Sequence, residues 1–253
     1  MLELKNICVT FRSEGNLERI ILNDLNLTIN PGEFVMLIGE NGAGKSTLFN
    51  VVSGFLKPNQ GQIFFNHKEV THTSQSFRSK SLAKVMQDPK LGTMENMTLY
   101  ENMAFALKRG EKRSLRNISD NSRRELFREK LTLLRMGLED RLDDVTGSLS
   151  GGQRQALSLV MAILSDSQIL LLDEITGALD PKMAETVMNL SDQIIRQEKK
   201  AALMITHNMA HAIAYGDRIV VLKDGRIAKE FVDLEKKSLT PKDLHDIASS
   251  ILI

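Results

Sequence analysis

The sequence has almost no cysteine, almost no net charge and no long hydrophobic run. Its single cysteine, Cys8, excludes an internal disulfide framework and a multi-cysteine zinc site, and it suits a reducing compartment. The 33 basic and 32 acidic side chains leave a net charge of +1, which gives no general attraction to nucleic acid or anionic lipid. We therefore expect no nucleic-acid partner.

No stretch approaches the roughly 18 consecutive apolar residues that a membrane span requires. The strongest runs, Phe34–Ile38 and Ile169–Leu172, have the length of buried strands. Residues 1–6 alternate between polar and apolar side chains and lack the basic-then-apolar form of a signal peptide. We therefore expect a cytoplasmic chain that does not cross a membrane by itself.

What remains is an ordinary globular composition. The chain has 253 residues, of which 42% are hydrophobic and 26% charged, enough for one domain with a sizeable core. Periodicity predicts short strands within 2–29, a buried strand at 34–38, a helix at 45–53 and helices within 88–148. Beyond these, helices at 152–164, 181–198 and 208–215 alternate with strands at 168–172, 201–205 and 218–223, and Thr240 and Pro241 begin a tail helix. This alternation predicts a mainly parallel sheet.

A glycine-rich loop lies between the apolar strand and the first helix. Residues 39–47 match the pattern G-x-x-x-x-G-K-[ST], in which glycines let backbone N–H groups surround a phosphate at a helix N-terminus. Lys45 would bridge the β- and γ-phosphates, Ser46 would ligate Mg²⁺, and Thr47 would contact the α-phosphate. The loop predicts an ATP site that includes Gly39, Asn41, Gly42, Ala43, Gly44, Lys45, Ser46 and Thr47.

Two carboxylates end the buried strand Ile169–Leu172. Asp173 would hold Mg²⁺ through its water shell, and Glu174 would orient and polarise the attacking water. An acidic cap on the following helix would give the same pair of residues. Together with the phosphate loop, the pair favours ATP hydrolysis.

Between these elements lies the sequence Leu149-Ser150-Gly151-Gly152-Gln153. Its serine and glycines would offer a hydroxyl and free N–H groups at a helix start, which suits an anion as well as a helix cap. LSGGQ is the signature of the ABC ATPases, and the chain resembles that family over residues 2–230. The resemblance implies a homodimer of this chain in which Ser150, Gly151, Gly152, Gln153 and Asp180 reach the nucleotide of the opposite copy.

The resemblance also assigns residues that no pattern singles out alone. Phe11 looks like the aromatic residue that stacks on adenine, although it also suits a core position. Gln87 is similar to the glutamine that reaches Mg²⁺ and the catalytic water, and His207 resembles the switch histidine at the γ-phosphate. His207 and His211 would suit a metal site by spacing, but Asn208 stands where a zincin pattern needs glutamate.

The family implies a catalytic set and an α/β fold. The catalytic residues are Lys45, Gln87, Glu174 and His207, and the Mg²⁺ ligands are Ser46, Gln87 and Asp173. The expected fold is a P-loop NTPase core of the RecA type with an N-terminal antiparallel β subdomain and an inserted helical subdomain. Within one domain of 1–253, we place the core in 1–87 and 156–230, the helical subdomain with the signature in 88–155, and a tail helix in 231–253.

The resemblance implies an ATPase that powers a separate integral-membrane permease from the cytoplasmic face of the membrane. A stand-alone cassette looks like a bacterial uptake subunit, and the signature region is similar to cassettes that serve amino-acid permeases with a receptor lipoprotein. An aromatic amino acid is the expected cargo, while the cargo itself and import versus export stay open.

Other readings of the sequence also stay open. The alternative function is a soluble ABC ATPase acting on ribosomes or DNA, although the chain shows neither a second cassette nor a long coiled coil. A GTPase would share the phosphate loop, but Asn66–Glu69 does not fit the guanine-reading N-K-x-D pattern. The basic stretch 108–135 would face lipid headgroups or acidic permease loops, or form a solvated helix face. The role of the tail stays open.

Overall fold

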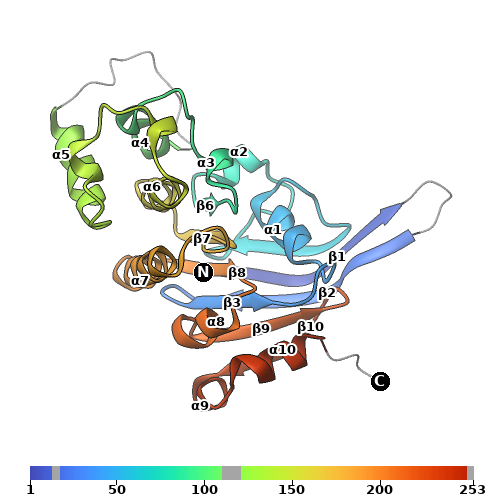
Figure 1. Ribbon diagram of the computed structural model, residues 1–253. Helices are drawn as coiled ribbons and strands as arrows, with labels where there is room; N and C mark the ends of the chain where they lie inside the picture. Colours follow the sequence, from blue (N-terminus) through green and yellow to red (C-terminus); the bar gives the residue numbers. More distant parts are fainter. Residues whose placement is uncertain (13–17, 110–120, 250–253) are drawn as a thin grey trace.

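A six-stranded, mostly parallel sheet forms the centre of the protein, of which the computed structural model describes residues 1–12, 18–109 and 121–249 (Figure 1). Its spatial order is β10-β9-β3-β8-β7-β6, and β10 is antiparallel to β9 while the other pairs are parallel. The strands are β3 (Phe34–Ile38), β6 (Leu82–Val85), β7 (Ile169–Asp173), β8 (Ala201–Ile205), β9 (Arg218–Lys223) and β10 (Arg226–Val232). Parallel neighbours require crossover connections, which the helices supply.

The middle strands are buried on both faces, as their continuous apolar sequences predict. In β3, Phe34, Met36 and Ile38 belong to the core on one side of the sheet, whereas Val35 and Leu37 belong to the core on the other. Successive side chains point to opposite faces, so an unbroken apolar run serves two cores. The first core is covered by α6 (Gly151–Ile163), α7 (Pro181–Gln197), α8 (Met209–Tyr215) and α10 (Pro241–Ser249).

An antiparallel sheet and one helix cover the second face. The sheet has the order β2-β1-β4-β5, with β1 (Leu2–Arg12), β2 (Glu18–Ile29), β4 (Gln60–Phe65) and β5 (Lys68–Glu69). Helix α1 (Lys45–Ser53) contributes its apolar side chains to the core that this sheet shares with the central sheet. The predicted antiparallel sheet is confirmed. Four short strands were expected within 2–29, but β1 and β2 are two long strands whose pairing is interrupted by register shifts.

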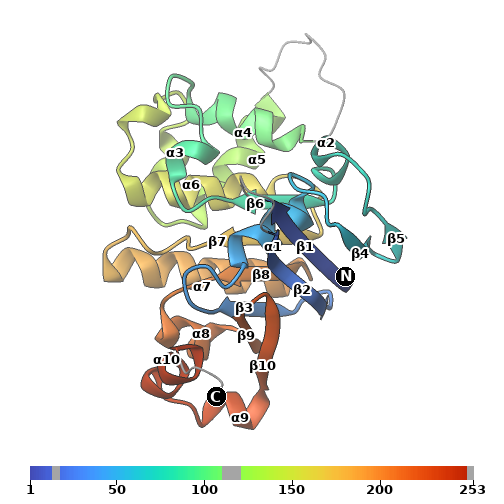
Figure 2. The ribbon, with the colours of Figure 1, turned by 90° about the vertical axis from the view of Figure 1, so that its right-hand side faces the viewer.

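A layer of helices lies beyond the β6 edge of the central sheet (Figure 2). It contains α3 (Pro89–Gly92), α4 (Leu99–Leu107), α5 (Asn121–Thr132) and α6, and α2 (Gln75–Arg78) precedes β6. Tyr100 and Phe127 pack with ring centroids 5.3 Å apart, and the buried Asn102 donates to carbonyls on both sides of the turn before α4. Helices were expected within 88–148, and the apolar residues up to Leu138 contributed to that prediction, but α5 ends at Thr132. The later apolar residues belong to a turn and a short 3₁₀ helix. The division into subdomains stays a prediction.

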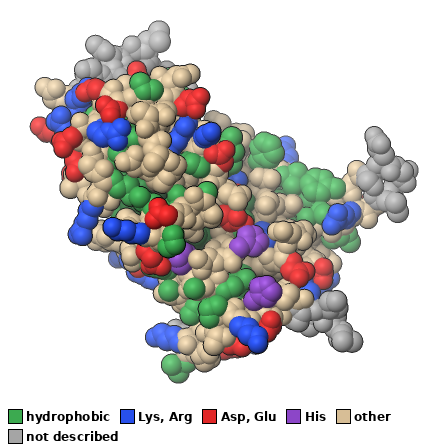
Figure 3. Space-filling view, in the orientation of Figure 1, with side chains coloured by type: hydrophobic (Ala, Val, Ile, Leu, Met, Phe, Trp, Pro, Cys, Tyr) green, Lys and Arg blue, Asp and Glu red, His purple; other side chains and the backbone are tan. Residues whose placement is uncertain are grey.

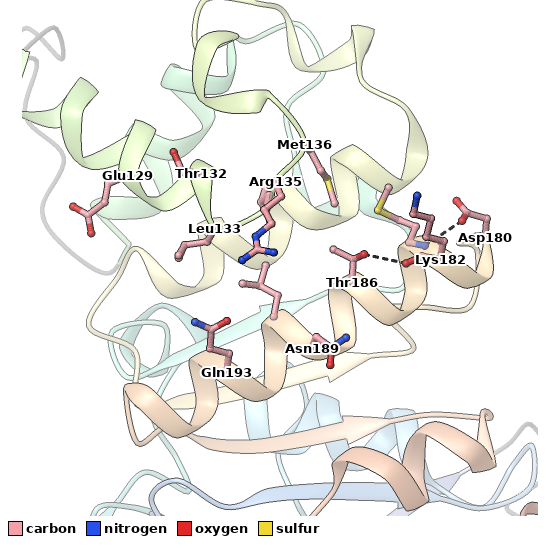
Figure 4. A pocket seen from close by; sticks show the side chains of 13 residues that line it. Glu129, Thr132, Leu133, Arg135, Met136, Asp180, Lys182, Thr186, Asn189 and Gln193 are labelled. Carbon is pink, nitrogen blue, oxygen red and sulfur yellow. Dashed lines mark hydrogen bonds between the residues drawn. The ribbon is translucent and has the colours of Figure 1, made fainter.

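A groove of about 1070 Å³ separates the end of α5 from one face of α7 (Figure 4). Leu133 and Arg135 line one wall, and Thr186 and Asn189 line the other. Helix α6 instead contributes to the main core together with α4 and α7. The helical layer therefore rests on the sheet through α6.

The described part of the basic stretch 108–135 carries paired charges. Arg124 donates from its two terminal guanidinium nitrogens to the carboxylate of Asp143 at 2.5 and 3.0 Å, and Lys130 Nζ lies 4.0 Å from Glu198 Oε1. Figure 3 shows acidic and basic side chains interspersed over this layer. Residues 110–120 of the stretch, with Lys112, Arg113 and Arg116, lie outside the described residues.

The C-terminal segment forms two helices where the sequence predicts one, α9 (Asp233–Lys237) and α10. Helix α10 begins as predicted: Thr240 Oγ1 accepts from the backbone N–H of Asp243, and Pro241 is the first helical residue. Leu244 and Ala248 are buried in the main core, to which Ala212 of α8 also belongs. Residues 250–253 of the predicted tail lie outside the described part.

Candidate functional site

The phosphate loop connects β3 to α1 through backbone conformations that only glycine adopts easily. Gly42 and Gly44 have φ of +87° and +106°, and a Cβ on Gly44 would lie 2.8 Å from the carbonyl oxygen of Ile21. No side chain caps the start of α1. The first backbone N–H groups of this helix therefore have no side-chain competitor for an anion.

Lys45 is buried inside this loop. Lys45 is only 7% exposed, and its Nζ donates to the carbonyls of Gly39 and Glu40 at 2.5 and 2.9 Å. Burial lowers the pKa of Lys45, and the carboxylates of Glu174 and Glu40 oppose this shift. The loop therefore holds the positive charge of Lys45 at the place where a phosphate group would bind.

Three polar side chains meet at the carboxyl ends of neighbouring parallel strands. Glu174 follows β7, Gln87 follows β6 and His207 follows β8. Gln87 Nε2 donates to Glu174 Oε2 at 2.8 Å, and His207 Nε2 lies 2.6 Å from Glu174 Oε1. Glu174 has a φ of +46°, and its own N–H donates to the carbonyl of Ile205 at 3.0 Å. A positive φ is uncommon for a residue other than glycine, and the contacts from the ends of β6 and β8 hold the Glu174 side chain in place.

These groups share one cavity of about 330 Å³ with the phosphate loop. Its lining comprises Arg19, Ile21, Glu40, Asn41, Gly42, Gly44, Lys45, Ser46, Thr47, Gln87, Asp173, Glu174, Ile205 and His207. Gly39 and Ala43 belong to the loop without lining the cavity. The arrangement joins a phosphate-binding loop to a carboxylate, an amide and an imidazole, which suits positioning a water against a phosphoryl group.

Sequence reasoning missed Lys84, whose Nζ lies 3.5 Å from Asp173 Oδ2. It also missed Arg19 and Ile21, which belong to no phosphate motif and are brought to the cavity by the position of β2; the structure pairs Arg19 with Phe11 of β1. Phe11 is 46% exposed and does not line the cavity. Phe11 lies near the end of β1, opposite Arg19, which does line the cavity.

The signature residues lie elsewhere. Ser150 caps α6: its Oγ accepts from the N–H of Gln153, and Gln153 Oε1 accepts from the N–H of Ser150. Asp180 likewise caps α7 by accepting from the N–H of Met183. None of Ser150, Gly151, Gly152, Gln153 and Asp180 lines the cavity. The helix cap that the sequence suggested at Ser150 is present. The signature residues and Asp180 do not line the cavity formed by the phosphate loop of their own chain.

The oxygen-rich donors at the cavity fit a magnesium ion bound together with phosphate oxygens. Ser46, Asp173 and Gln87 supply hydroxyl, carboxylate and amide oxygens, the hard ligands that Mg²⁺ prefers. Within 1–12, 18–109 and 121–249, no group of three or more His, Cys, Asp or Glu side chains is arranged to hold a metal alone. His207 and His211 contact different carboxylates: His207 Nε2 lies 2.6 Å from Glu174 and His211 Nε2 lies 3.3 Å from Glu185.

Comparison with known proteins agrees with this geometry. A family model described as "ABC transporter" matches residues 22–177. The tyrosine transport ATP-binding protein of Clostridioides difficile is 40% identical over 248 residues, which are 96% of this chain and 97% of that protein. The methionine import ATP-binding protein MetN of Rhodopseudomonas palustris is 35% identical over 86% of this chain, and the matched part spans 57% of that protein.

Solved structures show the same fold. A dimeric ATP-binding cassette in a post-hydrolysis state, bound to ADP and phosphate, superposes with a TM-score of 0.78 and 29% identity, covering 92% of this chain and 98% of that one. The predicted P-loop NTPase fold and the resemblance to the family are confirmed, and the chain binds nucleotide. The chain therefore belongs to the ABC transporter family and is one of its ATP-binding, ATP-hydrolysing subunits, which power solute uptake by a separate permease.

Proposed function

We propose that Glu174 is the group that activates water for ATP hydrolysis, with Gln87 and His207 holding it. The observation that carries this proposal is the pair of contacts at 2.8 and 2.6 Å that fix both carboxylate oxygens beside the phosphate loop. Lys45 and the N–H groups of the loop neutralise and orient the phosphates. Ser46, Asp173 and Gln87 would hold Mg²⁺, which would supply further neutralisation of the phosphate charge.

We further propose that two copies of this chain enclose the nucleotides head to tail. Ser150 caps the start of α6 and does not line the nucleotide cavity of its own chain, and a helix N-terminus suits a phosphate group. A second copy supplies that loop, so Ser150–Gln153 and Asp180 complete the opposite site. The dimeric state of the similar cassette supports this arrangement.

The permease needs a docking surface, and we propose the groove between the end of α1 and α3. It has a volume of about 300 Å³ and is lined by Ser53, Gln75, Ser79, Leu82, Lys84, Met86, Leu91, Gly92 and Arg109. Leu91 is 71% exposed on its rim, and Phe55, next in the chain after the turn that ends α1, is also exposed. Met86 joins this groove to Gln87, so a docked loop lies one residue from the active cavity.

Localisation follows from that partner. None of the described helices is long and apolar enough to span a bilayer. We propose that the permease holds the chain at the cytoplasmic face of the membrane, and that a receptor lipoprotein delivers the solute. The relative described as a tyrosine transport protein supports an aromatic amino acid as cargo.

Co-purification tests this assignment. The tagged chain is recovered from its native cell in mild detergent, and its companions are identified by mass spectrometry. A polytopic permease with a binding lipoprotein is the expected result, and amino-acid binding by that lipoprotein names the cargo. Recovery with ribosomes or DNA-processing proteins alone contradicts the transport assignment while leaving the ATPase chemistry intact.

Replacing Leu91 with glutamate will reduce recovery of the permease by about tenfold or more, because burying an unpaired carboxylate in an apolar contact is strongly unfavourable. ATP hydrolysis by the isolated chain will not change, since Leu91 does not line the nucleotide cavity. Leu234→Glu is the matched control: Leu234 is 81% exposed on α9, away from the groove. Equal permease recovery with both variants places the docking surface elsewhere.

A further inference from the structure

Arg19 lines the nucleotide cavity from a part of the chain that the phosphate motifs do not include. It stands on β2 directly opposite Phe11 of β1. Directly opposed residues of an antiparallel pair project from the same face, with Cβ atoms about 5 Å apart. An arginine and the predicted adenine-stacking phenylalanine are therefore neighbours on one surface beside the cavity.

Strand β2 is fixed against the phosphate loop. The backbone of Ile21 comes so close to Gly44 that a Cβ there would lie 2.8 Å from the Ile21 carbonyl oxygen. The N–H of Asn23 donates to the carbonyl of Gly225 at 2.9 Å, which fastens the same part of the strand to the turn after β9. The pairing with β1 has a register shift at Ile21, and it is regular again at Ile20 and Arg19. Arg19 is therefore held two residues before the place where the strand touches the loop.

The charge of Arg19 has no carboxylate partner among the described residues. The nearby Arg12 differs, because its Nε lies 2.9 Å from Glu18 Oε1. Lys45 is the other cation that lines the cavity, and it lies inside the loop that surrounds the β-phosphate. An exposed guanidinium can donate two parallel hydrogen bonds to one phosphate group.

We propose that Arg19 binds the α-phosphate of the bound nucleotide and forms, with Phe11 on the base, a two-residue clamp on the AMP part of the nucleotide. The proposal rests on the nucleotide site proposed above. The phosphate loop and Lys45 hold the terminal phosphates, and Phe11 takes the base. Arg19 stands between them on β2, where the α-phosphate joins the ribose. Arg19 thus sets nucleotide affinity without touching the phosphoryl group that is transferred.

Arg19→Ala tests the clamp against Arg12→Ala, which removes the same charge from the same hairpin. Competition against a fluorescent ATP analogue measures the affinities for ATP, ADP, AMP and adenosine. Arg19→Ala will weaken binding of the three nucleotides by about tenfold, the loss expected for a charged hydrogen-bonded contact at a half-open site. Binding of adenosine will not change, and Arg19→Lys will lie between. KM for ATP will rise by a similar factor while kcat at saturating ATP stays within about twofold.

Three outcomes overturn the proposal. If Arg19→Ala and Arg12→Ala weaken binding equally, the effect is general charge and not a clamp. If adenosine binding falls as much as ATP binding, Arg19 contacts the base. Lys45→Ala separates these failures from failure of the site itself: it abolishes binding of ATP if the phosphate loop is the nucleotide site, and unchanged binding overturns that assignment together with the clamp.

Discussion

Replacing Glu174 with glutamine will lower ATP turnover by about a thousandfold and leave ATP binding intact. Glutamine has nearly the same shape and keeps an oxygen for the amide of Gln87, but it cannot accept a proton from the attacking water. The contacts with Gln87 and His207 hold the native carboxylate in place, so removing its basicity removes the chemistry without removing the cavity. ATP will then persist between two copies, and the variant will accumulate as an ATP-bound dimer.

Steady-state phosphate release and size-exclusion chromatography with and without ATP measure the two effects. Glu185→Gln is the matched control, because Glu185 also lies beside a histidine, 3.3 Å from His211, but outside the nucleotide cavity. That variant will keep its turnover. Normal hydrolysis by Glu174→Gln would show that another group activates the water. Loss of turnover without an ATP-dependent dimer would contradict the head-to-tail arrangement instead.

The parts of the site that are continuous in sequence could be predicted, and the convergence of distant parts could not. The conformation of Gly39–Thr47 depends mainly on residues within the segment, namely its glycines, Lys45 and the helix that follows. A short sequence pattern is therefore enough to predict it. Gln87, Glu174 and His207 come from three separate strand ends, and residue spacing gives no information on the contacts between them. Only resemblance to a family pointed to Gln87 and His207. Their hydrogen-bonded arrangement around Glu174 required the structure.

Two strands of the central sheet were missed for physical reasons. β10 is an edge strand in which Phe231 is the buried hydrophobic residue and most other positions are exposed, so its pattern is weak. β6 has four residues that follow a serine- and lysine-rich turn, too few to show a period. In contrast, β3 and β8 were predicted with their observed limits, because strands buried on both faces are apolar throughout.

Arg78 contradicts the simplest expectation from composition, that arginine lies on the surface. It is 1% exposed and has no carboxylate partner among the residues that the structure describes. Its Nη1 donates to the carbonyls of Val51 and Val52 at 2.7 and 2.9 Å, and its Nη2 donates to those of Val70 and Thr71 at 2.7 and 2.8 Å. Burial lowers the pKa of Arg78 to about 10, so the guanidinium stays charged at neutral pH. A cation therefore terminates α1, at the negative end of the helix that starts with the phosphate loop.

Replacing Arg78 with methionine will lower the free energy of unfolding by about 3 kcal/mol, because the buried carbonyls of Val52 and Thr71 lose their donor. The carbonyls of Val51 and Val70 keep the N–H groups of Gly54 and Thr73 as donors. For a chain of this size the midpoint of thermal unfolding will fall by about 10 °C. Arg78→Lys will be intermediate, since one ammonium cannot match the planar fork that serves all four carbonyls. Arg226→Met, on the exposed edge strand β10, is the control and will shift the midpoint little. Similar midpoints for Arg78→Met and Arg226→Met would show that water or neighbouring groups satisfy the carbonyls.

If ATP affinity also falls in Arg78→Met well below its unfolding temperature, then the C-terminal cap of α1 holds the phosphate loop at the other end of the same helix in its binding conformation.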